Sequence, residues 1–307
     1  MSPKHIQFKP EVVTALQQGA PVVALESTVI SHGLPFPENL ELANEMEALV
    51  RGGDAVPATT AVIDGQVHVG LDEAGLAKLA KGVNLRKISV RDFGPAFVQK
   101  ASGGTTVAGT LVIAEQAGIK IFATGGIGGV HRDAHFDIST DLGQLAQSKV
   151  VVVCAGAKAI LDLPATLETL ETLGVPVIGY GTDEFPAFYS RESGLGVSAR
   201  ADSAEETADI AKAHWQMGGG GLLIAVPVPA EDAIPAPQVE EHIIQALEEA
   251  AAQGVRGQAV TPFLLSRVSQ LSQGKSLKAN LTLLKNNART AAAIAQHLYT
   301  PKGQLKA

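Results

Sequence analysis

Lys158 combines a reactive side chain with apolar surroundings. It follows four consecutive valines, Cys154 and the small residues 155–157. Apolar surroundings favour the neutral amine, which is the form that attacks carbonyl carbons and forms imines. The alternative is a solvated lysine in the first turn of the helix that we predict over 158–173. The dipole of that helix disfavours a cation there, but the two interpretations carry about equal weight.

Glu26 ends the strand that we predict over 21–25. Its apolar neighbours Val23 and Leu25 would raise the pKa of a carboxyl group and make it a proton donor. A helix cap or a surface salt bridge is the slightly favoured alternative.

Small and polar residues follow several of the predicted strands. In doubly wound sheets, ligands bind beyond the carboxyl ends of the strands. Glycines allow close backbone approach, and amides at a helix start attract anions. The spacing matches neither a Walker loop nor a dinucleotide fingerprint. Together these segments predict a phosphate pocket: they are 26–33, 102–106, 123–132, 154–158 and 179–185.

Acidic residues and histidines gather between 131 and 141. Carboxylate oxygens of this kind suit manganese or magnesium, although a solvated acidic loop is the commoner explanation of such a cluster. Asn280 and the asparagines of 286–288 could pair with a pyrimidine edge, or they could lie on a helix surface. Cys154 is interpreted as a core residue rather than a nucleophile.

The composition limits the class of protein. The chain has 307 residues, a net charge of −7, 46% hydrophobic residues and one cysteine. The chain has no basic block, so we do not expect a nucleic-acid-binding surface. A lone cysteine excludes an internal disulfide and a cysteine-based zinc site. No apolar run is long enough for a membrane span. We expect a cytoplasmic protein, since the first residues lack the core of a signal peptide.

The element pattern predicts an α/β fold. Apolar strands alternate with amphipathic helices between 105 and 228, which is typical of βαβ units and a largely parallel sheet. Asp64-Gly65 between two apolar runs predicts one β-hairpin. We expect residues 1–307 to form a single α/β/α layered domain, with a helical tail over about 236–300 packed on it.

Several longer motifs occur together, including "VVALESTVISHGLPFPEN", "GGTTVAGT", "IKIFATGGIGGVHR", "FDISTDL", "VVVCAGAKAILDLPATLETLETLGVPVIGY" and "TPFLLSRV". Over about residues 8–300 the chain resembles the pseudouridine-5′-phosphate glycosidase family, which includes the indigoidine synthase A-like proteins. The blocks at 123–132 and 154–180 are the most specific.

The resemblance implies an α/β/α lyase that cleaves pseudouridine 5′-phosphate reversibly into uracil and ribose 5-phosphate. It implies a homotrimer with one Mn²⁺ per subunit and neither nucleic acid nor membrane as partner. The family's proton donor matches Glu26 and its imine-forming lysine matches Lys158. Its metal ligand matches Asp137. Its substrate contacts match Lys87, Val107, Ser139, Thr140 and Asp141, and we add Thr106, His131 and Asn280 as expected contacts. Between His131 and Phe136 the chain is shorter than the family pattern.

Two other classes use some of the same features. A Schiff-base aldolase acting on a sugar phosphate needs the lysine and the phosphate site but no pocket for a base. A nucleotide-binding module needs neither acid nor nucleophile, so trapping of an imine on Lys158 would exclude it.

Overall fold

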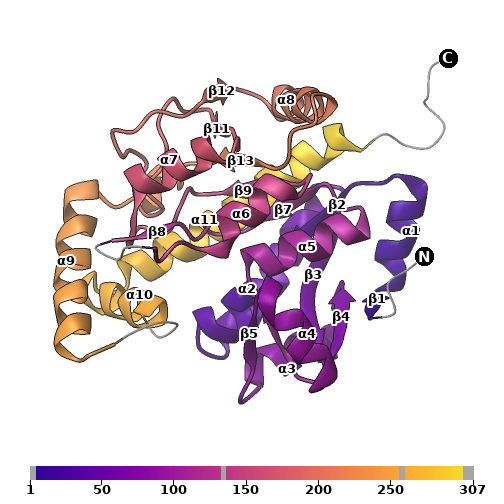
Figure 1. Ribbon diagram of the computed structural model, residues 1–307, viewed down its shortest axis with the longest axis horizontal. Helices are drawn as coiled ribbons and strands as arrows, with labels where there is room; N and C mark the ends of the chain where they lie inside the picture. Colours follow the sequence, from indigo (N-terminus) through magenta and orange to yellow (C-terminus); the bar gives the residue numbers. More distant parts are fainter. Residues whose placement is uncertain (1–4, 133–135, 256–259, 300–307) are drawn as a thin grey trace.

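A central twisted sheet organises the molecule, and most of its strands are parallel (Figure 1). The computed structural model describes residues 5–132, 136–255 and 260–299. The main strand order is β1-β4-β3-β2-β7-β9-β13-β11-β12, and β5 and β6 extend the sheet from β3. The strands are β1 (Ile6–Phe8), β2 (Val22–Leu25), β3 (Val56–Ile63), β4 (Gln66–Val69), β5 (Arg86–Ile88), β6 (Gly103–Thr105), β7 (Ile121–Ala123), β8 (Val130–His131), β9 (Val151–Cys154), β10 (Leu161–Asp162), β11 (Val177–Tyr180), β12 (Ala199–Ala201) and β13 (Leu222–Ala225).

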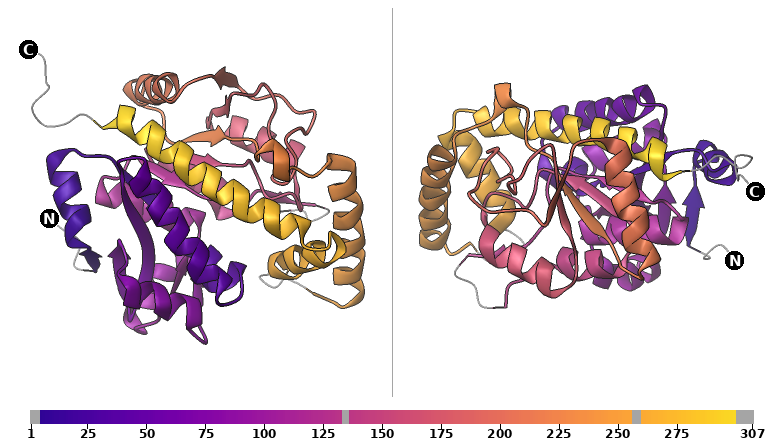
Figure 2. Two further views of the ribbon diagram at one scale, coloured as in Figure 1. Left: turned by 180° about the vertical axis from the view of Figure 1, so that it is seen from behind. Right: turned by 90° about the horizontal axis from the view of Figure 1, so that it is seen from above.

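Helices cover both faces of this sheet, as two further views show (Figure 2). One face carries α2 (Glu38–Gly52), α8 (Ala204–Gln216) and α11 (Lys275–Leu298); the other carries α5 (Val107–Ala117), α6 (Thr140–Gln147) and α7 (Leu163–Thr172). The remaining helices are α1 (Pro10–Gln18), α3 (Glu73–Lys81), α4 (Phe93–Val98), α9 (Ala236–Ala252) and α10 (Val260–Leu271). The predicted α/β/α layering is confirmed, because apolar strands buried on both faces need a helix layer on each side. The single domain over 1–307 stays a prediction.

Local signals placed several elements correctly. Asp64 and Gly65 both have positive φ, at 51° and 77°, and join β3 to β4 as the predicted hairpin. Gly19 ends α1 in the left-handed conformation with φ of 68°. α2 begins at Glu38, with Pro37 as its N-cap residue.

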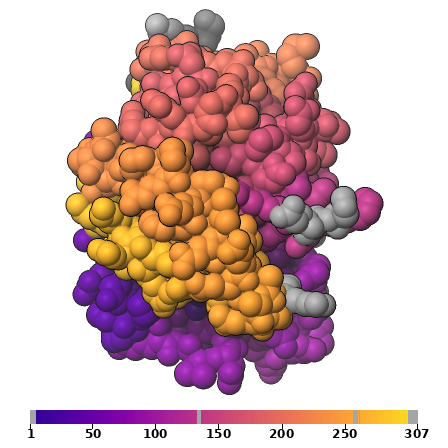
Figure 3. Space-filling view, turned by 90° about the vertical axis from the view of Figure 1, so that its left-hand side faces the viewer, coloured from indigo at the N-terminus to yellow at the C-terminus, as the bar shows by residue number. Residues whose placement is uncertain are grey.

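The C-terminal region is more than a tail on the surface. α11 packs along α2 and α8 and lies against β2, β7 and β9, so it forms a central part of one helix layer. α9 and α10 cover one end of the molecule beside the first turns of α11 (Figure 3). Among the described residues, we find no helix with both the length and the apolar character to cross a bilayer.

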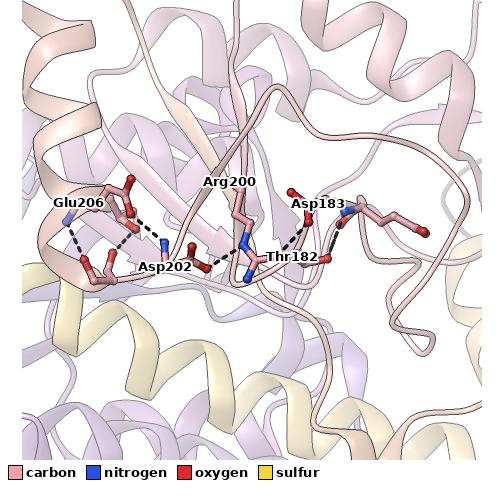
Figure 4. Close-up of polar contacts among 8 residues, drawn as sticks. Thr182, Asp183, Arg200, Asp202 and Glu206 are labelled. Carbon is pink, nitrogen blue, oxygen red and sulfur yellow. Dashed lines mark hydrogen bonds and ion pairs between the residues drawn. The ribbon is translucent and has the colours of Figure 1, made fainter.

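The sheet ends at β12, where charged side chains gather (Figure 4). The Arg200 guanidinium donates to Asp202 at 2.7 Å and to Asp183 at 2.9 Å. The Asp202 amide donates to the Glu206 carboxylate at the start of α8. Charges on an edge strand hinder pairing with another chain, so this cluster protects the edge.

Candidate active site

The sheet changes its direction of growth between β2 and β7. The chain leaves β2 through α2 and reaches β3 on one side; it leaves β7 through α6 and reaches β9 on the other. These two helices lie on opposite faces (Figures 1 and 2). The carboxyl ends of β2 and β7 therefore form the switch point at which doubly wound folds bind ligands, and we refer to this region as the crevice. Glu26 follows β2 directly, and Thr124 follows β7 directly.

Glu26 is half-buried at this point. The Thr124 hydroxyl donates a short hydrogen bond to its carboxyl oxygen Oε1. Burial raises the pKa of Glu26 above its ordinary value of 4.5, while nearby Lys158 and the Thr124 bond oppose that rise and Asp141 adds to it. The carboxyl therefore holds its proton more strongly than a solvated glutamate, as a general acid requires.

Lys158 reaches the same place from β9. Gly156 adopts a φ of 85°, which turns the chain after the strand. The Lys158 amide then donates to the Ile127 carbonyl at 3.1 Å, and its Nζ donates to the Gly126 carbonyl at 3.1 Å. The side chain is half-buried, and its charge acts on Glu26. An amine and a carboxyl group with a raised pKa thus lie together at the crevice.

The predicted helix start at residue 158 is wrong. Residues 161–162 form β10, which pairs with β8, and α7 begins only at Leu163. Asp162 caps that helix by accepting from the Ala165 amide at 3.0 Å, and Pro164 lies in its first turn. Lys158 therefore lies on a turn and not at a helix start, so the helix dipole gives no argument about its role.

Lys87 brings a second cation to the site from β5. It pairs in register with Gly104 of β6, and its side chain is exposed. Partial loss of water around the ammonium group lowers the pKa of Lys87, and the charge of nearby Lys158 lowers it further. The charges of Asp141 and Glu26 oppose this shift. Two lysines that repel one another at a crevice bind an anion favourably, because the anion relieves their repulsion.

Asp141 joins two separate elements near these groups. Its Oδ1 accepts from the Ala108 amide at 2.9 Å, and its Oδ2 accepts from the Gly128 amide at 2.8 Å. Only 6% of the residue is exposed. Both oxygens are used to join the start of α5 to the loop after β7, so its carboxylate mainly holds the site together.

The other expected substrate contacts lie at two helix starts. Thr106 caps α5 by accepting from the Gly109 amide at 3.1 Å, and Val107 is the first residue of that helix. Ser139 caps α6, and Thr140 is its exposed first residue. Because Asp141 connects the two helices, these residues are brought to one region. Helix starts of this kind suit a phosphate.

His131 is the last residue of β8, and Asp137 lies on the loop between β8 and α6. The His131 amide donates to the Asp137 carbonyl at 3.0 Å, and the Asp137 side chain is exposed. Within the described residues, no three His, Cys, Asp or Glu side chains group as metal ligands. The shortened segment and its residues 133–135 lie outside the described part. One exposed carboxylate fits a hard divalent ion whose remaining ligands are mostly water.

Arg132 belongs to the segment 123–132 of the predicted phosphate pocket, and its contacts are with protein groups. Its guanidinium forms a bidentate pair with Glu240 of α9, at 2.5 and 2.9 Å. It also donates to the backbone carbonyls of Ala159 and Leu161 at 3.2 Å. These contacts fix the turn after Lys158 instead.

Asn280 is half-buried on α11. Its position relative to the carboxyl ends of the strands follows from the direction in which α11 runs. At the far end of α11, the Tyr299 hydroxyl accepts from the Lys120 amide and donates to the Val22 carbonyl, both before the carboxyl ends of their strands. Asn287 contacts the carboxyl end of β7. α11 therefore runs antiparallel to the strands, and Asn280 lies two turns, about 10 Å, further toward the crevice side on the same helix face.

Comparison with known proteins agrees with this geometry. A model of the family described as "Indigoidine synthase A like protein" matches residues 11–297. The chain belongs to the indigoidine synthase A-like family. Its relatives include two proteins named pseudouridine-5′-phosphate glycosidase. The protein of Herpetosiphon aurantiacus is 55% identical to this chain, over an alignment that covers 94% of this chain and 97% of that relative. The protein of Solibacter usitatus is 54% identical, and the alignment covers 96% of this chain and 99% of that relative.

Solved structures of this family have the same fold. The prealnumycin C-glycosynthase AlnA, in complex with ribulose 5-phosphate, is 42% identical with a TM-score of 0.90 and covers 96% of this chain and 97% of its own. An indigoidine synthase A-like protein from Thermotoga maritima is 35% identical with a TM-score of 0.86 and covers 94% and 95%. These coverages extend over nearly the whole chain.

Two polar residues of this indigoidine synthase A-like site were not singled out from the sequence. Thr124 was part of a glycine-rich segment, and Asn287 was noted only as one of several helix asparagines. Both are fully buried, and they hydrogen-bond to Glu26 and to the β7 end respectively. The hydrogen bonds of these two residues are to neighbours that are distant in sequence, so no local pattern indicates them. Cys154 is a core residue as predicted, because it is fully buried, and that burial raises the pKa of its thiol to about 12.

Two surface pockets lie elsewhere. One, of about 440 Å³, is lined by Arg132, Glu240 and residues 161–164. The other, of about 690 Å³, lies beside α7 and β11. Neither includes Glu26 or Lys158. We place the site of this family member at the crevice, because Glu26, Lys158 and Lys87 act on one another there, whereas Arg132 and Glu240 of the first pocket already pair with each other.

Proposed function

We propose that this protein cleaves the carbon–carbon glycosidic bond of pseudouridine 5′-phosphate and releases uracil and ribose 5-phosphate. The observation that carries the proposal is the meeting of a carboxyl group with a raised pKa, Glu26, and an amine, Lys158, beyond the carboxyl ends of β2 and β9. The names of the relatives support the same reaction, a lyase step in pseudouridine breakdown.

The bond to be broken explains why a covalent route is needed. Direct departure of the base, as in O-glycoside hydrolysis, would leave an unfavourable carbanion on uracil. A covalent intermediate divides that barrier into smaller steps. The site supplies a nucleophile and a proton donor for such a route.

The route begins with opening of the ribose ring. Glu26 gives its proton to the ring oxygen, the bond from that oxygen to C1′ breaks, and the Lys158 amine bonds to C1′. The nitrogen gives a proton to the Glu26 carboxylate, and its lone pair then forms the imine as the C1′–uracil bond breaks. The electron pair of the broken bond stays on C5 of uracil and takes up that proton from Glu26. Water hydrolyses the imine, frees Lys158 and releases ribose 5-phosphate.

The phosphate is bound by Lys87 and the helix starts at Thr106 and Ser139, and Asn280 is available to the base. Remote binding energy of this kind orients the reacting atoms. Asp141 keeps the two helix starts together and adds to the rise in the pKa of Glu26. We assign His131, Val107 and Thr140 to substrate contacts in the same region.

We infer a Mn²⁺ site at Asp137, with one ion per subunit and most ligands from water. When bound, the ion would supply positive charge beside the segment that carries Ser139 to Asp141. We also propose that the protein acts as a homotrimer in the cytoplasm. Neither the ion nor the assembly enters the chemical steps above.

Synthesis from products tests the proposal directly. The protein is incubated with uracil, ribose 5-phosphate and Mn²⁺, and pseudouridine 5′-phosphate is sought by mass spectrometry. A Lys158→Arg variant is the matched control, because it keeps the charge but forms no imine. Turnover of ribose 5-phosphate without any uracil adduct would indicate a Schiff-base aldolase. Binding without any borohydride-trapped adduct would indicate a nucleotide-binding module.

A further inference from the structure

Asn287 holds the backbone that lies behind both reacting groups. It projects from α11 and is fully buried. Its side-chain amide donates to the Thr124 carbonyl at 2.8 Å and, more weakly, to the Gly125 carbonyl at 3.5 Å. These residues are more than 160 positions away in the chain. The contact thus joins the C-terminal helix to the end of β7.

The clamped segment connects to Glu26 on one side. Thr124 is the residue whose hydroxyl donates to Glu26, and its own amide donates to the Val153 carbonyl at 3.0 Å. The position of its backbone therefore decides where that hydroxyl lies. A displacement of this peptide would lengthen the bond to the acid.

The same segment connects to Lys158 on the other side. The Ala155 amide donates to the Gly125 carbonyl at 2.9 Å, and Gly126 supplies the carbonyl that accepts from Lys158 Nζ. Gly125 also lies tightly against α11, since a Cβ there would approach Leu284 to 3.2 Å. The close approach of backbone and helix lets the short Asn287 side chain reach two carbonyls.

The orientation of the Asn287 amide is fixed. Reversing it would set its oxygen against two carbonyl oxygens, so only the NH₂ group can face β7. Its oxygen is buried and has no partner within the described protein residues. A buried polar group in this state costs free energy, which marks a position where the side chain does more than fill space.

We propose that Asn287 is a positioning residue that sets the placement of the Glu26 carboxyl relative to the Lys158 amine. It acts through the Thr124–Gly125 peptide and does not touch the substrate. The proposal rests on the function proposed above, because it assigns Asn287 to that reaction.

Two substitutions separate the lost donor from lost packing. Asn287→Leu keeps the volume, and Asn287→Ala leaves a cavity, but both remove the NH₂ group. We expect both to lower kcat by about a hundredfold, the size of effect that a small misplacement produces, with KM changed less than about threefold. Asn286→Leu and Asn286→Ala, on the half-buried neighbour, are matched controls and should stay near wild type. Should Asn287→Leu fail to fold, Asn287→Ala carries the test.

The pH profile reports on the acid itself. Lys158, Thr124, Asp141 and Lys87 act on the pKa of Glu26, and the Thr124 bond lowers it. Loss of that bond should therefore move the high-pH limb of kcat/KM upward in both Asn287 variants. Thr124→Val should move it in the same direction, and the double variant should shift it no further than Thr124→Val alone, since both act through one contact.

The outcomes are distinct. Wild-type turnover with unchanged kcat and pH profile in folded Asn287 variants overturns the inference and leaves the proposed function standing. A kcat that falls only in Asn287→Ala, in step with a lower melting temperature, assigns Asn287 to packing and also overturns it. Absence of wild-type turnover of pseudouridine 5′-phosphate defeats the proposed function instead.

Discussion

Replacement of Lys158 by alanine should remove activity while leaving the fold almost intact. The side chain makes one hydrogen bond, to the Gly126 carbonyl, and is half-buried. Loss of that bond costs about 1 kcal/mol. Loss of the partly buried stem costs about 1 kcal/mol more, and release of side-chain entropy returns about 1 kcal/mol. The net loss is about 1 kcal/mol, a fall in melting temperature of roughly 2–4 °C.

The catalytic effect should be far larger. Removing the nucleophile of a covalent mechanism lowers kcat by on the order of 10⁴ to 10⁶. Two assays measure the contrast: uracil release from pseudouridine 5′-phosphate, and thermal unfolding followed by circular dichroism. Borohydride reduction with ribose 5-phosphate should add a pentose-phosphate mass to a peptide containing residue 158 in the wild type only.

A charge-preserving variant distinguishes a Lys158 that forms an imine from a Lys158 that acts only through its positive charge. Lys158→Arg keeps a cation beside Glu26 but cannot form an imine at neutral pH. It should be as inactive as Lys158→Ala. Substantial activity in Lys158→Arg, or a trapped adduct on a peptide without residue 158, would refute the reasoning, because the lysine would then act only on the pKa of Glu26.

Three further predictions concern the acid, the ion and the phosphate. Because burial raises the pKa of Glu26, its proton is retained above pH 4.5 and is lost as the pH rises through the raised value, so kcat/KM should have a high-pH limb. Glu26→Gln should abolish that limb, lower kcat by about 10²–10⁴ and increase stability at neutral pH, where the wild-type carboxylate is costly to bury; an unchanged limb would exclude Glu26 as the acid. Chelation should abolish activity and Mn²⁺ should restore it, and Asp137→Ala should raise the Mn²⁺ concentration required; full activity in metal-free buffer would remove the ion from the mechanism. Unphosphorylated pseudouridine should be a poorer substrate by about a thousandfold in kcat/KM, about 4 kcal/mol. Lys87→Ala should harm the phosphorylated substrate far more than the nucleoside, and an equal effect on both would assign Lys87 to the ribose or the base.

Much of the local structure could be predicted from the sequence. The Asp64-Gly65 turn, the buried strands around 151–154 and the helix that Gly19 ends follow from short-range conformational preferences and from apolar runs. The positions of Glu26 and Lys158 at strand ends could be found in the same way. A carboxyl end of a strand and its first polar residue are adjacent in the chain, so no distant contact is needed to recognise them.

The start of α7 could not be predicted in this way. Residues 158–162 have apolar periodicity that suits a helix, yet 161–162 pair with β8, and the Lys158 amide bonds to the Ile127 carbonyl. Those hydrogen bonds satisfy the backbone better than a first helical turn would, because a helix start leaves its amides without partners. The competing partners come from a segment some thirty residues earlier, which no local pattern contains.

The roles of Asp141, Thr124 and Asn287 depended on tertiary structure alone. Asp141 is a solvated acidic residue by its local pattern, but two backbone amides from separate elements surround it in the fold. By its local pattern Asn287 is an ordinary helix asparagine, and its hydrogen bond to the end of β7 follows only from the packing of α11 against that strand. The sequence by itself determined most of the elements and the reactive residues that follow them. The charge state of Glu26 was decided by the fold, because a pKa depends on burial and on charges brought close from distant parts of the chain.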